Sequence, residues 1–113
     1  QDCYRVLKQG GVLNLQSEGP LFNTSAFIDL NKCTEAIFGA ASTRCYLAYI
    51  STYPTGMWSF ITAQKETELN YANFDISEAA IFSQQQHLQY YSPEMHFAAY
   101  ALPPFVRDMI RTK

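Results

Sequence analysis

The sequence lacks several features that would define its class directly. No apolar run approaches the roughly 18 residues that a membrane-spanning helix needs, and no GxGxxG-like run for binding phosphates occurs in the 113 residues. Neither sign of charge dominates, since the formal net charge is −2 and the isoelectric point is near 5.6. This balance gives no electrostatic footprint for nucleic acid or an anionic membrane. We therefore predict neither a nucleic-acid partner nor a membrane partner.

Cysteine is scarce, with three residues at Cys3, Cys33 and Cys45 and no CxxC spacing. An odd and widely spaced set argues against a disulfide framework or a zinc site and favours reduced thiols, so a cytoplasmic protein is predicted. The two histidines, His87 and His96, have no Cys, Asp or Glu at ligand spacing. No metal site is predicted.

The composition is that of a globular domain. Hydrophobic residues make up 48% and aromatic residues 15% of the chain, which excludes a disordered segment and suffices for a modest core. The opening residues, QDCYRVLKQGG, are typical of the last turns of a helix that ends at a glycine C-cap. Because the chain opens inside a helix, we interpret residues 1–113 as the C-terminal part of a longer protein.

Apolar periodicity and breaker residues predict alternating strands and helices. Strands are expected at residues 12–16, 43–50 and 57–64, and helices at residues 23–38, 77–87 and 104–111. Asn23 or Thr24 is expected to cap the first of these helices, and Gly39 to end it. Pro93 and Pro103 are interpreted as punctuation of an irregular tail.

This order of elements predicts the α/β class. A strand, a helix and a second strand form a right-handed parallel unit, and a loop of about six residues then joins antiparallel neighbours. A mostly parallel sheet with an antiparallel edge hairpin is the pattern of the methyltransferase-like, doubly wound (Rossmann-like) fold. Ligands in such sheets lie beyond the carboxyl ends of the strands. Gln16 and Tyr53 are therefore expected to face one crevice.

The loop between the last two strands, STYPTGMWSF, carries large amphipathic aromatics where a hairpin tip normally has small polar residues. Together with LKQGGVL, LQSEGPLF and YYSPEMHFAAYALPPFV, it resembles, in order and spacing, the C-terminal half of spermidine synthases, the polyamine aminopropyltransferases. The resemblance extends from Cys3 to about Ile110. It implies transfer of an aminopropyl group from decarboxylated S-adenosylmethionine, a co-substrate, to putrescine, giving spermidine and methylthioadenosine, with no cofactor.

The resemblance assigns roles to four residues. Tyr53 matches a tyrosine beside the attacking amine that hydrogen-bonds the catalytic aspartate, and Trp58 matches an aromatic wall of the putrescine channel. Gln16 matches a glutamine that contacts the diamine, and Glu18, two residues further on, is expected to counter the distal ammonium. Taken without the family, Tyr53 and Trp58 are typical of aromatics at a core edge or an interface. Gln16 would then hydrogen-bond a neighbouring backbone group, and Glu18 would be solvated.

The resemblance also implies that the nucleotide-binding half and the catalytic base lie upstream of Gln1. This chain alone is then expected to be inactive, and the full-length enzyme to be a homodimer or homotetramer. Two alternatives stay open. The protein is an aminopropyltransferase for another amine, such as cadaverine, agmatine or spermidine, or it is a truncated, non-catalytic paralogue that acts as a binding or regulatory subunit.

Overall fold

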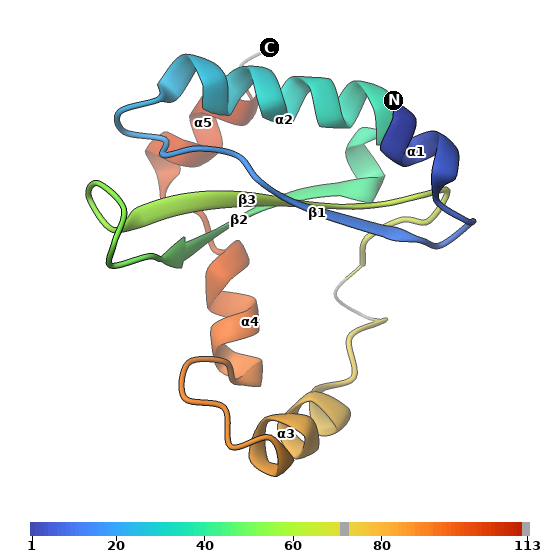
Figure 1. The fold of residues 1–113 in the computed structure, drawn as a ribbon, viewed down its shortest axis with the longest axis vertical. Helices are drawn as coiled ribbons and strands as arrows, with labels where there is room; N and C mark the ends of the chain where they lie inside the picture. The colour runs from blue at the N-terminus through green and yellow to red at the C-terminus, as the bar shows by residue number, and fades with distance from the viewer. Residues whose placement is uncertain (71–72, 112–113) are drawn as a thin grey trace.

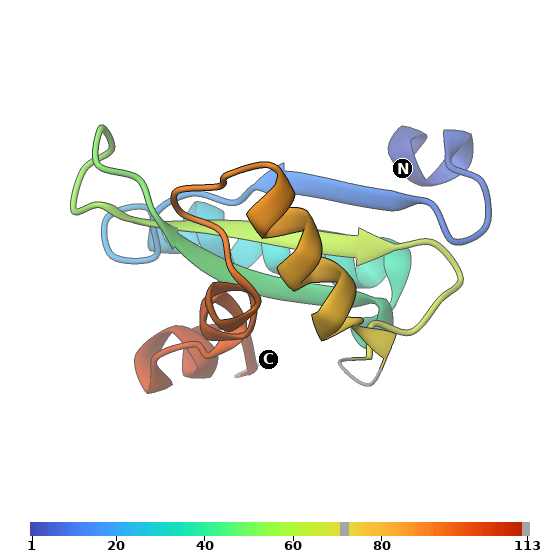
Figure 2. The ribbon, with the colours of Figure 1, turned by 90° about the horizontal axis from the view of Figure 1, so that it is seen from below.

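The computed structural model describes residues 1–70 and 73–111, which form a three-stranded sheet with helices on both faces (Figure 1). Its elements are α1 (Asp2–Val6), β1 (Val12–Gln16), α2 (Thr24–Phe38), the 3-10 turn η1 (Ala40–Ser42), β2 (Thr43–Tyr49), β3 (Met57–Gln64), α3 (Ile76–Gln85), α4 (Pro93–Tyr100) and α5 (Pro104–Arg111). Helices α2 and α5 cover one face of the sheet, and α4 packs on the other (Figures 1 and 2). Within these residues, no helix has the length and hydropathy to cross a membrane.

The strand order is β1-β3-β2, and β3 runs antiparallel to both neighbours. The predicted antiparallel pairing of β2 with β3 is confirmed, and β1 and β2 run in the same direction as expected. The hairpin of β2 and β3 lies at one edge of the described sheet, but its antiparallel strand β3 is not the outermost strand, because it lies between β1 and β2. Helix α2 connects β1 to β2, which are not adjacent in the sheet. The loop at residues 50–56 then reverses the chain, so that β3 lies between them.

The register of the sheet brings two chain segments to the same end. Gln16 lies opposite Phe60, and Tyr49 lies opposite Met57. The carboxyl ends of β1 and β2 therefore meet beside the start of β3, as the sequence predicted. The loops at residues 17–23 and 50–56 both leave the sheet at this end (Figures 1 and 2).

Alternation along β3 separates its two faces, because successive strand side chains point to opposite sides. Ser59, Ile61 and Ala63 are buried toward α2 and α5, whereas Trp58 and Phe60 point the other way and are half-buried. We call the second side, which α4 covers in part, the open face. The core on the first side is built from Phe27, Cys45 and Val106, with Ile28, Leu47, Leu102, Met109 and Ile110 packed around them.

Helix α2 presents one face to this core. Its buried residues are Phe27, Asn31, Thr34 and Phe38, spaced three or four apart. The two polar members cause no desolvation problem, because each donates to the carbonyl four residues earlier in its own helix. Both predicted ends are confirmed, with Asn23 as the N-cap residue and Gly39 as the C-cap residue.

Helix α3 differs from its predicted range, 77–87, by no more than two residues at either end, and two other helices differ more. Helix α1 ends at Val6 instead of continuing to the glycines, because the Lys65 ammonium takes over its end and donates to the carbonyls of Tyr4 (2.7 Å) and Leu7 (2.9 Å). Helix α4 was not predicted. Its Pro93 is the first helical residue and not a break, since a proline there loses no helical hydrogen bond.

The three cysteines are free and differ in exposure, since Cys3 and Cys33 are exposed and Cys45 is buried. Burial raises the pKa of the Cys45 thiol to about 12. Because the thiolate is the reactive form, we expect iodoacetamide at about pH 8 to modify Cys3 and Cys33 while Cys45 stays unmodified. Peptide-resolved mass spectrometry measures this difference. Labelling in denaturant is the control, in which Cys45 must react, and native labelling of Cys45 as fast as Cys33 would contradict the prediction.

Candidate functional site

The loop at residues 50–56, which we call the platform, is built from two successive tight turns. The Tyr53 amide donates to the Ile50 carbonyl and the Gly56 amide donates to the Tyr53 carbonyl, both at 3.0 Å. The Ile50 amide closes the loop onto the Gly56 carbonyl at 2.8 Å. Gly56 has φ +72, and a Cβ there would lie 2.4 Å from the Tyr49 ring, so only glycine fits without displacing that ring. Tyr53 lies at the junction of the two turns.

This platform holds Tyr53 against Trp58. Their ring centroids are 4.6 Å apart with planes at 57°, and Tyr53 remains 37% exposed. The sequence-predicted pair is thus brought together, with Trp58 on the open face of β3. A tilted pair of amphipathic rings of this kind is suited to contact with an aliphatic or cationic group.

The segment after β1 also packs against Trp58. A Cβ on Gly19 would lie only 3.1 Å from Cζ3 of the indole, so the absence of a side chain permits this close approach. The indole Nε1 is buried, and no hydrogen-bond acceptor reaches it within the described part of the chain. Trp58 is therefore fixed by Gly19 and Tyr53 and retains an unused donor.

Gln16 lies on the open face, because it is paired with Phe60 and paired residues share a face. Its side chain is exposed and has no hydrogen-bond partner among residues 1–70 and 73–111. Phe60 stacks on Tyr46 with ring centroids 5.2 Å apart, and the Tyr46 hydroxyl exchanges hydrogen bonds with the Asn14 side chain. The open face thus has polar groups along β1 beside an aromatic surface on β2 and β3.

Glu18 is held more firmly than a solvated residue would be. Its backbone has φ +71, a left-handed conformation that is uncommon outside glycine. The side-chain amide of Asn23 donates to the Glu18 carboxylate at 3.0 Å, and the backbone amide of Ser59 donates to the Glu18 carbonyl at 3.0 Å. The carboxylate is therefore held by the Asn23 side chain, one residue before the glycine that contacts Trp58.

Sequence reasoning missed a pair of serines behind this site. Ser17 and Ser59 are both 0% exposed, and their hydroxyl oxygens lie 2.8 Å apart. Serines separated by 42 residues carry no signal of pairing in a single sequence. The sequence did offer one indication. Ser59 occupies an inward-facing position in the alternation of β3, where an apolar residue is usual.

Sequence reasoning also missed Tyr90, whose hydroxyl accepts a hydrogen bond from the Tyr49 amide at 3.3 Å. Tyr90 and Met95 help to line an apolar hollow of about 360 Å³ beside the platform, together with Leu47, Ala48, Tyr49, Thr55, Gly56, Met57, Ala98 and Ala99. The hydrogen bond ties the segment before α4 to the carboxyl end of β2. The signal available was the unusual YYSPEMH run.

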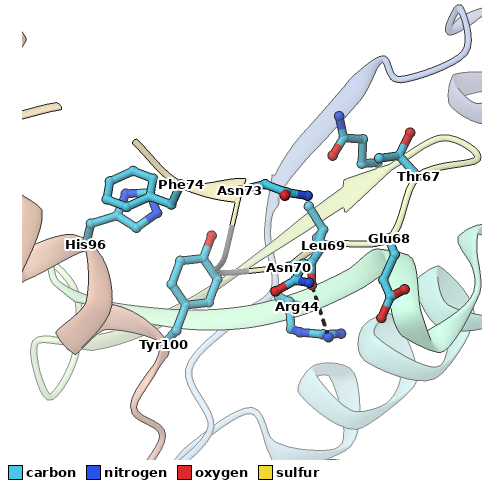
Figure 3. Close-up of a pocket in the computed structure, with 10 residues that line it drawn as sticks. Arg44, Thr67, Glu68, Leu69, Asn70, Asn73, Phe74, His96 and Tyr100 are labelled. Atoms are coloured by element: carbon cyan, nitrogen blue, oxygen red, sulfur yellow. Dashed lines mark hydrogen bonds between the residues drawn. The ribbon is translucent and has the colours of Figure 1, made fainter. Parts of the chain in front are cut away.

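A separate cavity of about 370 Å³ lies at the opposite end of the sheet (Figure 3). It is lined by Arg44, Gln64, Thr67, Glu68, Leu69, Asn70, Asn73, Phe74, His96 and Tyr100. The Arg44 guanidinium is engaged by three backbone carbonyls, those of Ala40, Thr43 and Leu69, at 2.8–3.3 Å. None of the predicted site residues lines this cavity.

His96 is a packing residue of that cavity wall. Its ring stacks on Phe74 with centroids 4.0 Å apart (Figure 3), and its Nδ1 lies 3.1 Å from the Tyr91 hydroxyl. Burial lowers the pKa of His96, so its neutral form predominates near pH 7. Among the described residues, no group of three or more His, Cys, Asp or Glu side chains is arranged to hold a metal ion.

Comparison with known proteins gives a consistent result. The family profile described as "Spermine/spermidine synthase domain" matches residues 1–75. The polyamine aminopropyltransferase of Thermotoga maritima is 36% identical over 107 residues, which cover 95% of this chain and 34% of that protein. The polyamine aminopropyltransferase of Desulforudis audaxviator is 36% identical over 112 residues, which cover 98% of this chain and 38% of that protein.

Solved structures extend the match to the fold. The spermidine synthase from Thermotoga maritima has a TM-score of 0.86 at 33% identity, covering 98% of this chain and 38% of that one. A spermidine synthase in complex with the transition-state analogue AdoDATO has the same TM-score and identity, covering 98% of this chain and 36% of that one. The chain thus spans 34–38% of the length of these relatives. Since the profile and the fold agree over most of its length, the chain belongs to the spermine/spermidine synthase domain family.

Proposed function

We propose that residues 1–113 are the C-terminal part of an aminopropyltransferase that converts putrescine and decarboxylated S-adenosylmethionine to spermidine and methylthioadenosine. The observation that carries the proposal is the Tyr53–Trp58 pair, held by a hydrogen-bonded loop at the carboxyl ends of β1 and β2. The names of the relatives support aminopropyl transfer. The structural neighbour that binds a transition-state analogue supports a site for an aminopropyl donor.

The chemistry is an in-line displacement at a carbon activated by a sulfonium group. The lone pair of the amine forms the new C–N bond as the C–S bond breaks, and sulfur leaves as the neutral thioether of methylthioadenosine. The amine must be neutral to attack, whereas putrescine is doubly protonated near pH 7, so a base must remove one proton. That base belongs to the upstream part of the proposed enzyme, and this chain supplies binding and orientation.

Each residue of the site has a defined role in this proposal. The rings of Tyr53 and Trp58 cover the aliphatic diamine, attract its remaining charge through their faces and exclude water. The Tyr53 hydroxyl orients the attacking amine and the upstream base. The Gln16 side chain, exposed on the open face, accepts from an ammonium group, and the Glu18 carboxylate balances the distal charge.

The proposal includes a larger, Rossmann-like sheet. Within the described residues, β1 pairs with β3 along one edge and leaves its other edge without a strand. Such an edge presents a row of backbone donors and acceptors that a further strand would satisfy. Upstream strands pairing there would complete the doubly wound fold and bring the nucleotide site beside Gln16. We also expect a homodimer or homotetramer of the full-length enzyme.

Steady-state kinetics on the full-length protein that carries this chain tests the proposal. With decarboxylated S-adenosylmethionine as donor, putrescine is expected to give the highest kcat/KM among putrescine, cadaverine, agmatine and spermidine, measured as release of methylthioadenosine. Residues 1–113 alone are the control and are expected to release none. A higher kcat/KM for another amine supports the alternative specificity. No transfer to any amine, with co-purification of an intact synthase, supports the regulatory subunit.

A further inference from the structure

We propose that Ser59 is a positioning residue for the amine-binding side of the site, acting through Glu18 and Trp58. The inference rests on the proposed function, because it assigns Ser59 an effect on amine binding. Ser59 touches neither predicted ligand position itself. It lies on the core side of β3, directly between Trp58 and Phe60 in the sequence, and its side chain is 0% exposed.

The hydroxyl of Ser59 joins two strands behind the site. Its one proton is shared between the backbone carbonyls of Ser17 (2.8 Å) and Glu18. Because its single proton is directed to these carbonyls, the Ser17 hydroxyl is the donor in the contact between the two side chains. Two backbone hydrogen bonds accompany these contacts. The Ser17 N–H donates to the Ser59 carbonyl at 2.9 Å, and the Ser59 N–H donates to the Glu18 carbonyl at 3.0 Å. The ladder thus continues past the last residue of β1.

Glu18 needs this support because its backbone is in the left-handed region at φ +71. A residue with a Cβ adopts that region only when its surroundings over-determine it, and such outliers concentrate at functional sites. Two donors from Ser59, the amide and the hydroxyl, converge on the Glu18 carbonyl. Removing the hydroxyl removes one of the two and leaves the Ser17 hydroxyl without its acceptor in a buried place.

The left-handed backbone conformation of Glu18 determines where its own carboxylate and the following residue, Gly19, lie. It directs the carboxylate to the Asn23 side chain and brings Gly19 against the indole of Trp58. When Glu18 relaxes to an ordinary extended conformation, its carboxylate and the surface behind Trp58 both shift. The amine loses affinity, whereas the donor site in the upstream half is unaffected.

The test compares three serine-to-alanine variants of the full-length protein. Ser59→Ala is expected to raise the KM for putrescine about tenfold, the order of one lost hydrogen bond to a buried group. Its KM for decarboxylated S-adenosylmethionine and its kcat are expected to stay within about twofold of wild type, since those depend on the upstream half. Ser17→Ala keeps both carbonyl contacts of Ser59, and Ser42→Ala removes a buried serine at the far end of the sheet. Both are expected to stay within about twofold in all constants.

Hydrogen exchange provides a readout independent of activity. Ser59→Ala is expected to accelerate amide exchange in peptides spanning residues 17–20, and Ser42→Ala to leave them unchanged. Ser59→Cys, which keeps the volume with a weaker donor, is expected to be intermediate and serves if the alanine variant does not fold. An active wild type with an unchanged putrescine KM in Ser59→Ala or Ser59→Cys overturns the inference alone. An inactive wild type overturns the proposed function and the inference with it.

Discussion

Replacing Tyr53 by Phe in the full-length protein is expected to lower kcat/KM for putrescine about a hundredfold. The ring contact with Trp58, 4.6 Å between centroids, is retained by the variant, so only the hydroxyl is lost. In the proposed mechanism that hydroxyl orients the amine and the base, and one well-placed polar group at a reacting centre contributes on the order of a hundredfold. Release of methylthioadenosine at varied putrescine concentration measures the change.

Tyr49→Phe is the matched control for this experiment. Tyr49 lies at the end of β2, is 67% exposed and packs on Gly56 on the other side of the same loop. Its hydroxyl has no role in the proposed reaction, so kcat/KM is expected to stay within about twofold of wild type. Equal activity of Tyr53→Phe and Tyr49→Phe would falsify the assignment of Tyr53. A loss confined to Tyr53→Ala would reduce its role to that of an apolar wall.

The second large effect is on stability. Phe27→Ala is expected to lower the free energy of unfolding by about 3–5 kcal/mol, the range found when a buried Phe is truncated and a cavity remains. Phe27 is 0% exposed and joins α2 to the core residues Cys45 and Val106. Urea unfolding followed by circular dichroism measures the change in midpoint.

Phe22→Ala is the control for Phe27→Ala. Phe22 lies five residues earlier in the loop before α2 and is 74% exposed, so the free energy of unfolding is expected to change by less than about 0.5 kcal/mol. A loss below about 1.5 kcal/mol for Phe27→Ala would show that the core closes around the deletion. Phe27 would then stabilise the fold as one apolar residue among several, and not through close packing of its ring.

Local sequence signals predicted much of the fold. The ends of α2 follow from a cap position at Asn23 and a breaker at Gly39, and β3 and α5 were predicted with their observed bounds. Local signals failed where one residue type serves two purposes, since Pro93 can either break a chain or begin a helix, and here it begins α4. The strand order could not be predicted either. A crossover followed by a hairpin is compatible with β3 on either side of β2, and the sequence does not distinguish the two.

In the candidate site too, residues with a local sequence signal were predicted, and contacts between distant residues were not. Tyr53 and Trp58 were predicted from resemblance and from a loop composition unsuited to a plain turn, and the structure brings their rings into contact. Gln16 was expected at a strand end and lies there, on the open face. The buried support behind them was not predicted, because the hydrogen bonds from Ser59 to the 17–18 backbone cross 41 or 42 residues. Only a three-dimensional register shows such pairs.

The insertion of β3 between β1 and β2 has a consequence for the order of assembly during synthesis. The ribosome delivers β1 and β2 first, and neither is the hydrogen-bonding neighbour of the other. Both pair with a strand that is synthesised later, and the paired residues of β1 and β3 are 44 to 52 positions apart in the sequence. Trp58 travels on that late strand. The ring contact between Tyr53 and Trp58 therefore forms only after β3 has been synthesised.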